Sequence, residues 1–341
     1  MPLVRRLWVA AACVLALVFA TSAAQAQNLN VLPADTEMTV TINVQQILKS
    51  EALKGEKASL IINLAKAKIS EGLEDKGVAK WFKKAEFDLF KDLGSITFAV
   101  PGARNPEEAF ILLEGNFDAE KIEAAALEAS KEADGPGLKV IKLGGIKAFE
   151  ISPKDEKVLY VGILNKKTMI ACSTKDDFTQ AVARASAKKA DFKNDAFKSL
   201  VSTINSKQSF SMVATSNVLG KLADKAPEGA VNPQAKQALE ILKQMDGFST
   251  AVTVAKDIDF QVGVAAQNAD NAGKYALLGN AGLLAIKAKV KDAADQDEKL
   301  MPAVDILNTI RIEAKGANLL VRGQITVETL EKLMKALPIP Q

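Results

Sequence analysis

The chain has 341 residues, 48% of them hydrophobic, which suffices for one large or two medium globular domains. Its net charge is only +3, and lysines and acids alternate along most of its length, which argues against a nucleic-acid-binding protein. Histidine is absent, so the side chain used most often in acid–base catalysis and in binding transition metals is missing.

Residues 1–26 are predicted to be a cleavable secretory signal. Arg5 and Arg6 form its positive part, residues 7–19 are uncharged and apolar, and Ala24-Gln25-Ala26 places small residues where signal peptidase needs them. The apolar stretch is shorter than the roughly 20 residues that span a bilayer. We expect cleavage before Gln27, a mature chain without a transmembrane helix, and a periplasmic or extracellular location.

The chain has two cysteines, and only Cys172 remains after removal of the signal. Cys13 lies inside the apolar stretch, and apolar residues continue behind it, which argues against a lipoprotein. A single cysteine forms no internal disulfide, so we expect Cys172 to be a buried, inert thiol.

Taken in chain order, the first half predicts strands joined by short turns. Residues 38–44 alternate between apolar and polar, the period of a half-buried strand, and a helix is expected directly after them. Asp118 is expected to cap a helix, because its side chain can accept hydrogen bonds from the first turn. Another helix is expected to start at Thr174, with Asp176 and Asp177 in its first turn, where the helix dipole favours negative charge. Gly144-Gly145 predicts a two-residue hairpin turn. Further strands are expected at 95–100, 110–117, 138–143, 146–151, 158–164 and 168–172.

The second half repeats this order of elements. Strands are expected at 210–215, 249–254, 260–266, 310–314 and 319–325, and helices at 233–245, from Asp270 and from Thr326. Three blocks are offset by about 150 residues, as an internal duplication would produce. Sequence identity between the halves is very low, so coincidence is the competing explanation.

These patterns predict an α+β protein made of two similar copies of a mainly antiparallel sheet, with helices packed on one face. Residues 185–207 are rich in Ala, Lys and Ser and are expected to hold the hinge between the copies. We assign residues 1–26 to the signal, 27–190 to the first repeat, 191–207 to a linker, and 208–341 to the second repeat.

No sequence motif identifies a catalytic or cofactor site. The phosphate-binding patterns G-x-x-x-x-G-K-[ST] and G-x-G-x-x-G are absent, and Gly279-Asn280-Ala281-Gly282 falls inside a predicted helix. The acidic cluster Asp292, Asp295, Asp297 and Glu298 lacks the spacing of a calcium loop. The pairs Glu107-Glu108 and Asp257/Asp259 resemble ordinary charged turns at strand ends. We therefore predict no catalytic, cofactor-binding or metal-binding residue.

Three lysine pairs could contact an anionic polymer or lipid headgroups, but no aromatic series lies among them to stack on bases. They are Lys83-Lys84, Lys166-Lys167 and Lys188-Lys189. The most membrane-like fragment is Trp81-Phe82-Lys83-Lys84, for which core packing is the preferred interpretation. An unknown protein, lipid or envelope polymer stays open as partner.

The start of the mature chain resembles a known group of proteins. Leu32-Pro33-Ala34-Asp35-Thr36, followed by the segment from Thr39 to Leu48, is similar to uncharacterised secreted proteins of planctomycete-type bacteria. The resemblance covers about 20 residues and implies export. It implies no activity, cofactor or site.

The leading hypothesis is an exported, non-catalytic binding or structural protein of the bacterial envelope with an unknown ligand. The alternative is an envelope hydrolase that uses carboxylates or a serine–lysine pair such as Ser206-Lys207. A pocket in which two carboxylates, or a serine and a lysine, converge would favour the hydrolase.

Overall fold

The computed structural model describes residues 28–54, 63–64, 66–71, 82–102, 108, 110–131, 137–152, 157–187, 190–205, 207–224 and 245–336. The predicted signal and most of the predicted helix 233–245 lie outside these ranges. The chain divides into two compact units, Met1–Asn194 and Asp195–Gln341. Among the described helices, none combines the length and apolar character needed to cross a bilayer.

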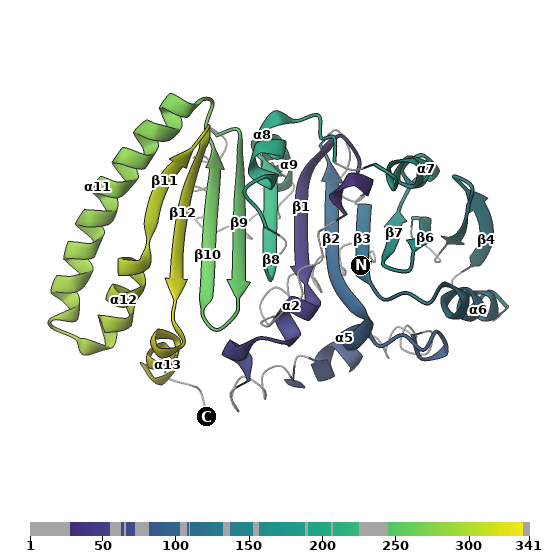
Figure 1. The fold of residues 1–341 in the computed structure, drawn as a ribbon, viewed down its shortest axis with the longest axis horizontal. Coiled ribbons are helices and arrows are strands. Elements are labelled where there is room, and N and C mark those ends of the chain that lie inside the picture. Colours follow the sequence, from purple (N-terminus) through teal and green to yellow (C-terminus); the bar gives the residue numbers. More distant parts are fainter. Residues whose placement is uncertain are drawn as a thin grey trace. The chain divides into compact units, whose positions relative to one another are not determined.

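The first unit contains antiparallel strands in the order β1-β2-β3-β7-β6-β5-β4 (Figure 1). The strands are β1 (Thr36–Asn43), β2 (Leu93–Pro101), β3 (Phe110–Gly115), β4 (Leu138–Leu143), β5 (Ile146–Ile151), β6 (Leu159–Asn165) and β7 (Thr168–Cys172). The helices are η1 (Leu29–Val31), α2 (Val44–Leu48), η2 (Glu51–Leu53), α5 (Leu89–Asp92), α6 (Ala119–Ala129) and α7 (Lys175–Arg184).

Several local predictions for this unit are confirmed. Asp118 caps α6 by accepting from the amides of Glu120 and Lys121, and the Thr174 side chain accepts from the amide of Asp177 at the start of α7. Gly144 and Gly145 form the β4–β5 turn with positive φ angles of 58° and 89°, which glycine adopts without steric cost.

Helices cover both faces of the first sheet, which corrects the expectation that they cover only one. Ile122 of α6 packs in a cluster that includes Val161 and Ile163 of β6. A Cβ atom at the intervening residue, Gly162, would overlap the ring of Phe178 on α7. Because successive strand residues point to opposite faces, α6 and α7 lie on opposite sides of the sheet. The central strand β7 is buried along its whole length, Thr168–Cys172, as cover on both faces requires.

The second unit contains antiparallel strands in the order β11-β12-β10-β9-β8. The strands are β8 (Phe210–Thr215), β9 (Gly247–Val254), β10 (Ile258–Ala265), β11 (Arg311–Lys315) and β12 (Asn318–Ile325). The helices are α8 (Asp195–Val201), α9 (Ser216–Asp224), α11 (Ala269–Ala294), η4 (Glu298–Leu300), α12 (Met301–Thr309) and α13 (Val327–Ala336).

The second sheet is also covered on both faces. Gly279 of α11 packs against Ile312, which pairs with Val321 on β12. Leu200 of α8 packs beside Gly263, whose strand partner is Leu320, the neighbour of Val321. Helices α8 and α11 therefore lie on opposite faces.

Helix α8 falls within residues 191–207, the segment that we assigned to a linker from its composition. Its side chains Phe197 and Leu200 are fully buried, so this stretch contributes to the core of the second unit. In both units, helices pack on antiparallel sheets, and the α+β class is confirmed.

Candidate functional site

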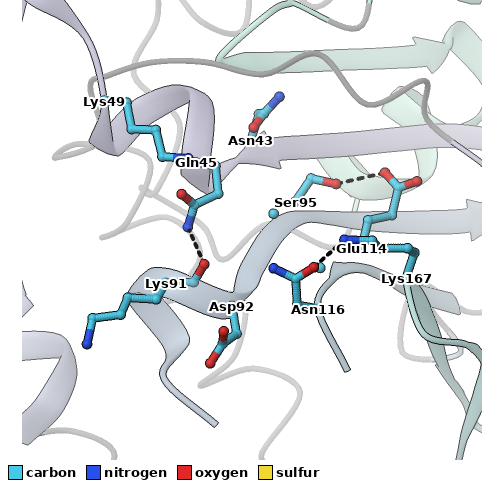
Figure 2. A pocket seen from close by; sticks show the side chains of 11 residues that line it. Asn43, Gln45, Lys49, Lys91, Asp92, Ser95, Glu114, Asn116 and Lys167 are labelled. Atoms are coloured by element: carbon cyan, nitrogen blue, oxygen red, sulfur yellow. Dashed lines mark hydrogen bonds between the residues drawn. The ribbon is translucent and has the colours of Figure 1, made fainter. Parts of the chain in front are cut away.

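A polar hollow of about 270 Å³ lies in the first unit at one end of strands β1, β2 and β3 (Figure 2). We call it the Glu114 hollow. It is lined by Asn43, Gln45, Lys49, Lys91, Asp92, Gly94, Ser95, Glu114, Gly115, Asn116 and Lys167.

Helix α2 forms one wall of the Glu114 hollow and is fixed by two side chains. The Asn43 side chain, at the end of β1, accepts from the amide of Gln46 at 3.0 Å and so caps α2. Nε2 of Gln45 donates to the carbonyl oxygens of Phe90, Lys91 and Leu93 at 2.9–3.1 Å. These bonds tie α2 to the segment that enters β2.

The wall next to α2 begins with the short helix α5. Asp88 caps it by accepting from the amides of Phe90 and Lys91. The Asp92 carboxylate accepts from the backbone amide of Asp88 at 2.8 Å, and the Asp92 carbonyl accepts from the amide of Asn116 at 2.7 Å. The backbone at the mouth of the hollow is therefore held by its own hydrogen bonds.

Glu114 is the unusual residue of this site. It lies near the end of β3 and is only 4% exposed. Its Oε2 accepts from the Ser95 hydroxyl at 2.9 Å, as Figure 2 shows, and its Oε1 accepts from the backbone amide of Asn28 at 3.0 Å. The Asn28 side chain in turn donates to the hydroxyl of Thr168 at 3.2 Å.

Burial raises the pKa of Glu114 above its ordinary value, because removal from water disfavours the charged form. The hydrogen bonds from Asn28 and Ser95 act in the opposite direction and are outweighed. Within the described residues Glu114 forms no ion pair. The floor of the hollow is therefore a carboxyl group held by two neutral donors.

Three lysines add positive charge to the lining. Lys91 pairs with Asp88 at 2.9 Å, which raises the pKa of Lys91, and the Lys167 ammonium donates to the Asn116 side chain. Lys49 extends from the end of α2 beside Gln45 (Figure 2). A hollow lined by a buried acid and by lysines can accept a ligand that carries both charges. In the part of the chain that the structure describes, no group of three His, Cys, Asp or Glu side chains could hold a metal ion.

The acidic residues that the sequence suggested do not meet in one site. Glu108 pairs with Lys157 at 3.8 Å, and Glu107 lies outside the described residues. Asp257 accepts from the amide of Val327 at 3.0 Å, and Asp297 caps η4. Asp259 accepts from the Gln324 side chain, and burial, with a smaller contribution from Asp257, raises its pKa. Glu108 thus forms an ion pair, Asp259 binds across paired strands, and Asp257 and Asp297 bind amides at the starts of helices.

Of the lysine pairs, only Lys166-Lys167 contributes to the hollow, through Lys167. Lys84 pairs with Glu128 at 2.8 Å, and Lys188-Lys189 lies outside the described residues. The rings of Phe82 and Phe87 are in tilted contact, with centroids 5.4 Å apart and an interplanar angle of 53°. Trp81 lies outside the described residues.

Two further predictions concern nucleophiles. Cys172 is buried, as expected, and its thiol donates to the carbonyl of Thr174 at 3.5 Å. Ser206, the proposed partner of Lys207, lies outside the described residues, so the structure leaves this pair untested.

Sequence reasoning missed Glu114 and Ser95. The available signal was a single acid inside an otherwise apolar strand, Phe-Ile-Leu-Leu-Glu-Gly, where a glutamate requires polar partners. Those partners could not be named in advance, because Asn28 is 86 positions away in the sequence.

The second unit has a hollow of about 490 Å³ lined by Asp259, Asn308, Thr309, Arg311, Arg322, Gly323 and Gln324. Arg322 is already engaged there, because it donates to Gln261 at 2.9 Å and pairs with Glu313. Asp259, the acidic residue of this second lining, is exposed, whereas Glu114 is buried. The Glu114 hollow is therefore the stronger candidate site.

Comparison with known proteins adds no assignment to this geometry. No family model, no curated protein and no solved structure matches the chain.

Proposed function

We propose that this chain is an exported, non-catalytic binding protein of the bacterial envelope, and that the Glu114 hollow binds a small ligand with an ammonium group. The observation that carries the proposal is Glu114 itself, a glutamate 4% exposed that has two neutral hydrogen-bond donors and lines a hollow. A buried carboxylate without a cation costs several kcal/mol, and a ligand cation would recover part of that cost.

We also propose that the ligand carries an anionic group, because three lysines line the hollow. Lys49, Lys91 and Lys167 attract an anionic group, while Glu114 attracts a cationic one. A zwitterion, such as a free amino acid or the end of a short peptide, carries both charges a few ångströms apart. A hollow of about 270 Å³ suits a ligand of that size.

Calorimetric titration with alanine and alanyl-alanine tests this proposal. We expect binding with one ligand per chain, and loss of binding when the amine is acetylated. Glu114→Gln should lower the affinity roughly 10- to 100-fold, as expected for the loss of a charged hydrogen bond. Glu120→Gln, at an exposed position on α6, serves as the control and should bind normally. Equal affinity of Glu114→Gln and the wild type would reject the proposal.

Export is supported by the leader-like residues 1–26 and by the resemblance of residues 32–48 to secreted proteins. We propose a periplasmic or extracellular location after cleavage near Ala26. The ligand in the envelope would then be a small zwitterion that is free in solution, or a zwitterionic group attached to a protein, a lipid or a polymer.

We also propose that the two units arose by duplication. When β4 and β5 are set aside, the order β1-β2-β3-β7-β6 of the first unit matches β8-β9-β10-β12-β11 of the second. Each first strand runs directly into a helix, α2 or α9, and a helix separates the second hairpin from the first in both units. This order supports a common ancestor better than sequence identity does.

Under this correspondence only the first unit has the acid. Ser95 pairs with Glu114 across β2 and β3, while Ser249, at the matching place in β9, pairs with Gly263. Leu200 packs beside Gly263, so an apolar side chain takes the place of the polar lining. A single ligand per chain follows from this difference.

One observation favours the hydrolase alternative. The Ser95 hydroxyl donates to Glu114, and a carboxyl group with a raised pKa can act as a general base for a serine. A fluorophosphonate reagent would test it. Covalent labelling of Ser95, found by peptide mass spectrometry and lost in Glu114→Gln, would support a hydrolase, and an unlabelled Ser95 would support binding without catalysis.

A further inference from the structure

Most of the exposed large apolar side chains in the described residues lie on α11, η4 and the first residue of α12. They are Tyr275, Leu277, Leu278, Leu284, Ile286, Leu300 and Met301. Leu277, Leu278 and Leu284 are 74%, 70% and 68% exposed, values typical of surface lysines rather than leucines. An apolar cluster of this kind marks an interaction surface.

The opposite side of α11 is already used within the second unit. Ala272 and Ala276 are buried, Gly279 packs against Ile312, and the Asn280 side chain donates to the carbonyl of Ile312 at 3.0 Å. The helix is therefore apolar on two sides, one of which covers its own sheet. A helix that is apolar all round is normally buried all round.

The exposed side of α11 has a regular pattern. Leu277, Ala281, Leu284 and Ala288 follow each other at spacings of four, three and four residues, which places them in one stripe along the helix. Large and small side chains alternate in the stripe. No charged residue occurs between Tyr275 and Ile286, and Lys274 and Asp292 lie on the same flank near its two ends.

We propose that this stripe is the contact between two copies of the chain, paired with their α11 helices antiparallel about a twofold axis between Gly282 and Leu283. In that register each Leu277 lies opposite Ala288 of the other copy, and each Leu284 lies opposite Ala281. Large side chains then enter gaps left by small ones, as close packing requires.

Charge supports the same arrangement. Antiparallel pairing brings Lys274 of one copy beside Asp292 of the other at both ends of the stripe, and within the described residues neither forms an ion pair. A parallel pair would instead place leucine on leucine, alanine on alanine and like charges together. Twofold pairing is also the commonest form of self-association.

A lipid surface fits the pattern less well. Two of the four stripe residues, Ala281 and Ala288, are alanines. They offer little apolar area to lipid chains, but they allow a second helix to approach closely.

Sedimentation equilibrium of the mature chain from about 1 to 200 µM tests the proposal, a range that covers contacts of modest area. We expect a concentration-dependent dimer. Leu284→Lys should weaken the dimer at least about tenfold, since it buries an unpaired charge in the contact. Leu127→Lys, at another exposed leucine on α6, should leave the dimer unchanged. Circular dichroism confirms that both variants are folded.

Cysteine cross-linking tests the direction of the helices. A mixture of Lys274→Cys and Asp292→Cys chains should form disulfide-linked dimers under mild oxidation, whereas each variant alone should form few. Cys172 is buried and does not interfere. Lys274→Asp should weaken the dimer, and combining it with Asp292→Lys should restore it.

Three results would overturn the proposal. One is a monomer over the whole concentration range. Another is cross-linking within each single variant, which would mean parallel helices. The third is a monomer that binds vesicles of anionic phospholipid and loses that binding in Leu284→Lys, which would make the stripe a lipid contact.

Discussion

Glu114 and Glu128 differ in the exposure and in the partners of their side chains. The side chain of Glu128 is 62% exposed and pairs with Lys84 at 2.8 Å, an arrangement that contributes little to stability because water screens it. Glu114 is buried at the end of a strand and has only neutral donors. Glu128 can therefore be replaced with little effect on stability, whereas Glu114 makes the stability of the protein depend on pH.

The burial of Glu114 predicts a pH-dependent stability difference between the wild type and Glu114→Gln. The folded-state pKa lies above the ordinary value of 4.5, so the folded protein binds this proton more tightly than the unfolded chain does. The contribution of Glu114 to stability is therefore most favourable below pH 4.5 and is lost as the pH rises through the folded pKa.

Urea unfolding of both proteins between about pH 4 and pH 8 measures this difference. Glu114→Gln has no proton to lose, so its stability relative to the wild type should rise across the window above pH 4.5 and then level off. Glu128→Gln should follow the wild type. A constant difference between Glu114→Gln and the wild type at every pH would contradict the raised pKa.

Gly162 and Gly220 predict opposite effects of the same substitution. A Cβ atom at Gly162 would overlap the ring of Phe178, so Gly162→Ala should destabilise the protein by about 1–3 kcal/mol. Gly220 lies within α9 with open space around it, so Gly220→Ala should stabilise by up to about 1 kcal/mol. Denaturant unfolding compares them, and a Gly162→Ala protein as stable as the wild type would show that the packing around Gly162 is misassigned.

Among the elements, α8 makes the clearest prediction. Leu200 is fully buried and packs beside Gly247 and Gly263, so Leu200→Ala should cost about 2–5 kcal/mol. Lys198→Ala, on the exposed side of the same helix, should change stability by less than about 0.5 kcal/mol. Thermal unfolding measures both. If Leu200→Ala behaved like Lys198→Ala, residues 195–201 would be a linker after all.

Strands and caps were predictable from the sequence because they depend on local patterns. The alternation at 38–44 corresponds to β1, and the strand expected at 95–100 corresponds to β2. Asp118 caps α6 as its side chain implies, and α7 begins directly after Thr174, as expected. Helix α8 was missed because its segment was assigned from overall composition, although Phe197, Leu200 and Val201 have the spacing of one helix face.

The candidate site was not predictable for a different reason. Glu114 and Ser95 are 19 positions apart and meet only through the pairing of β2 with β3, and Asn28 reaches Glu114 from the far end of the unit's sequence. A site built by pairing distant segments has no motif of fixed spacing. The covering of both faces of each sheet was missed because helix periodicity does not tell which face a helix will cover.

At the scale of the whole molecule, the proposal of export predicts a defined mature chain. The purified protein should begin at Gln27, as Edman sequencing or intact mass would report, and Ala24→Leu together with Ala26→Leu should block processing. A chain recovered from its own host with Met1 or Arg5 still present would contradict cleavage.

The hydrogen bond between Asn28 and Glu114 has a consequence for the order of events during maturation. If the leader is removed before Gln27, as we propose, the cut lies one residue ahead of the amide that donates to the buried Glu114 side chain, and Val31 and Leu32 behind it are buried. A peptidase needs several extended residues around its cut, and on the carboxyl side of this one the chain turns into η1 at Leu29. We therefore expect cleavage to precede the folding of the first unit, so that a precursor with an intact leader would be incompletely folded.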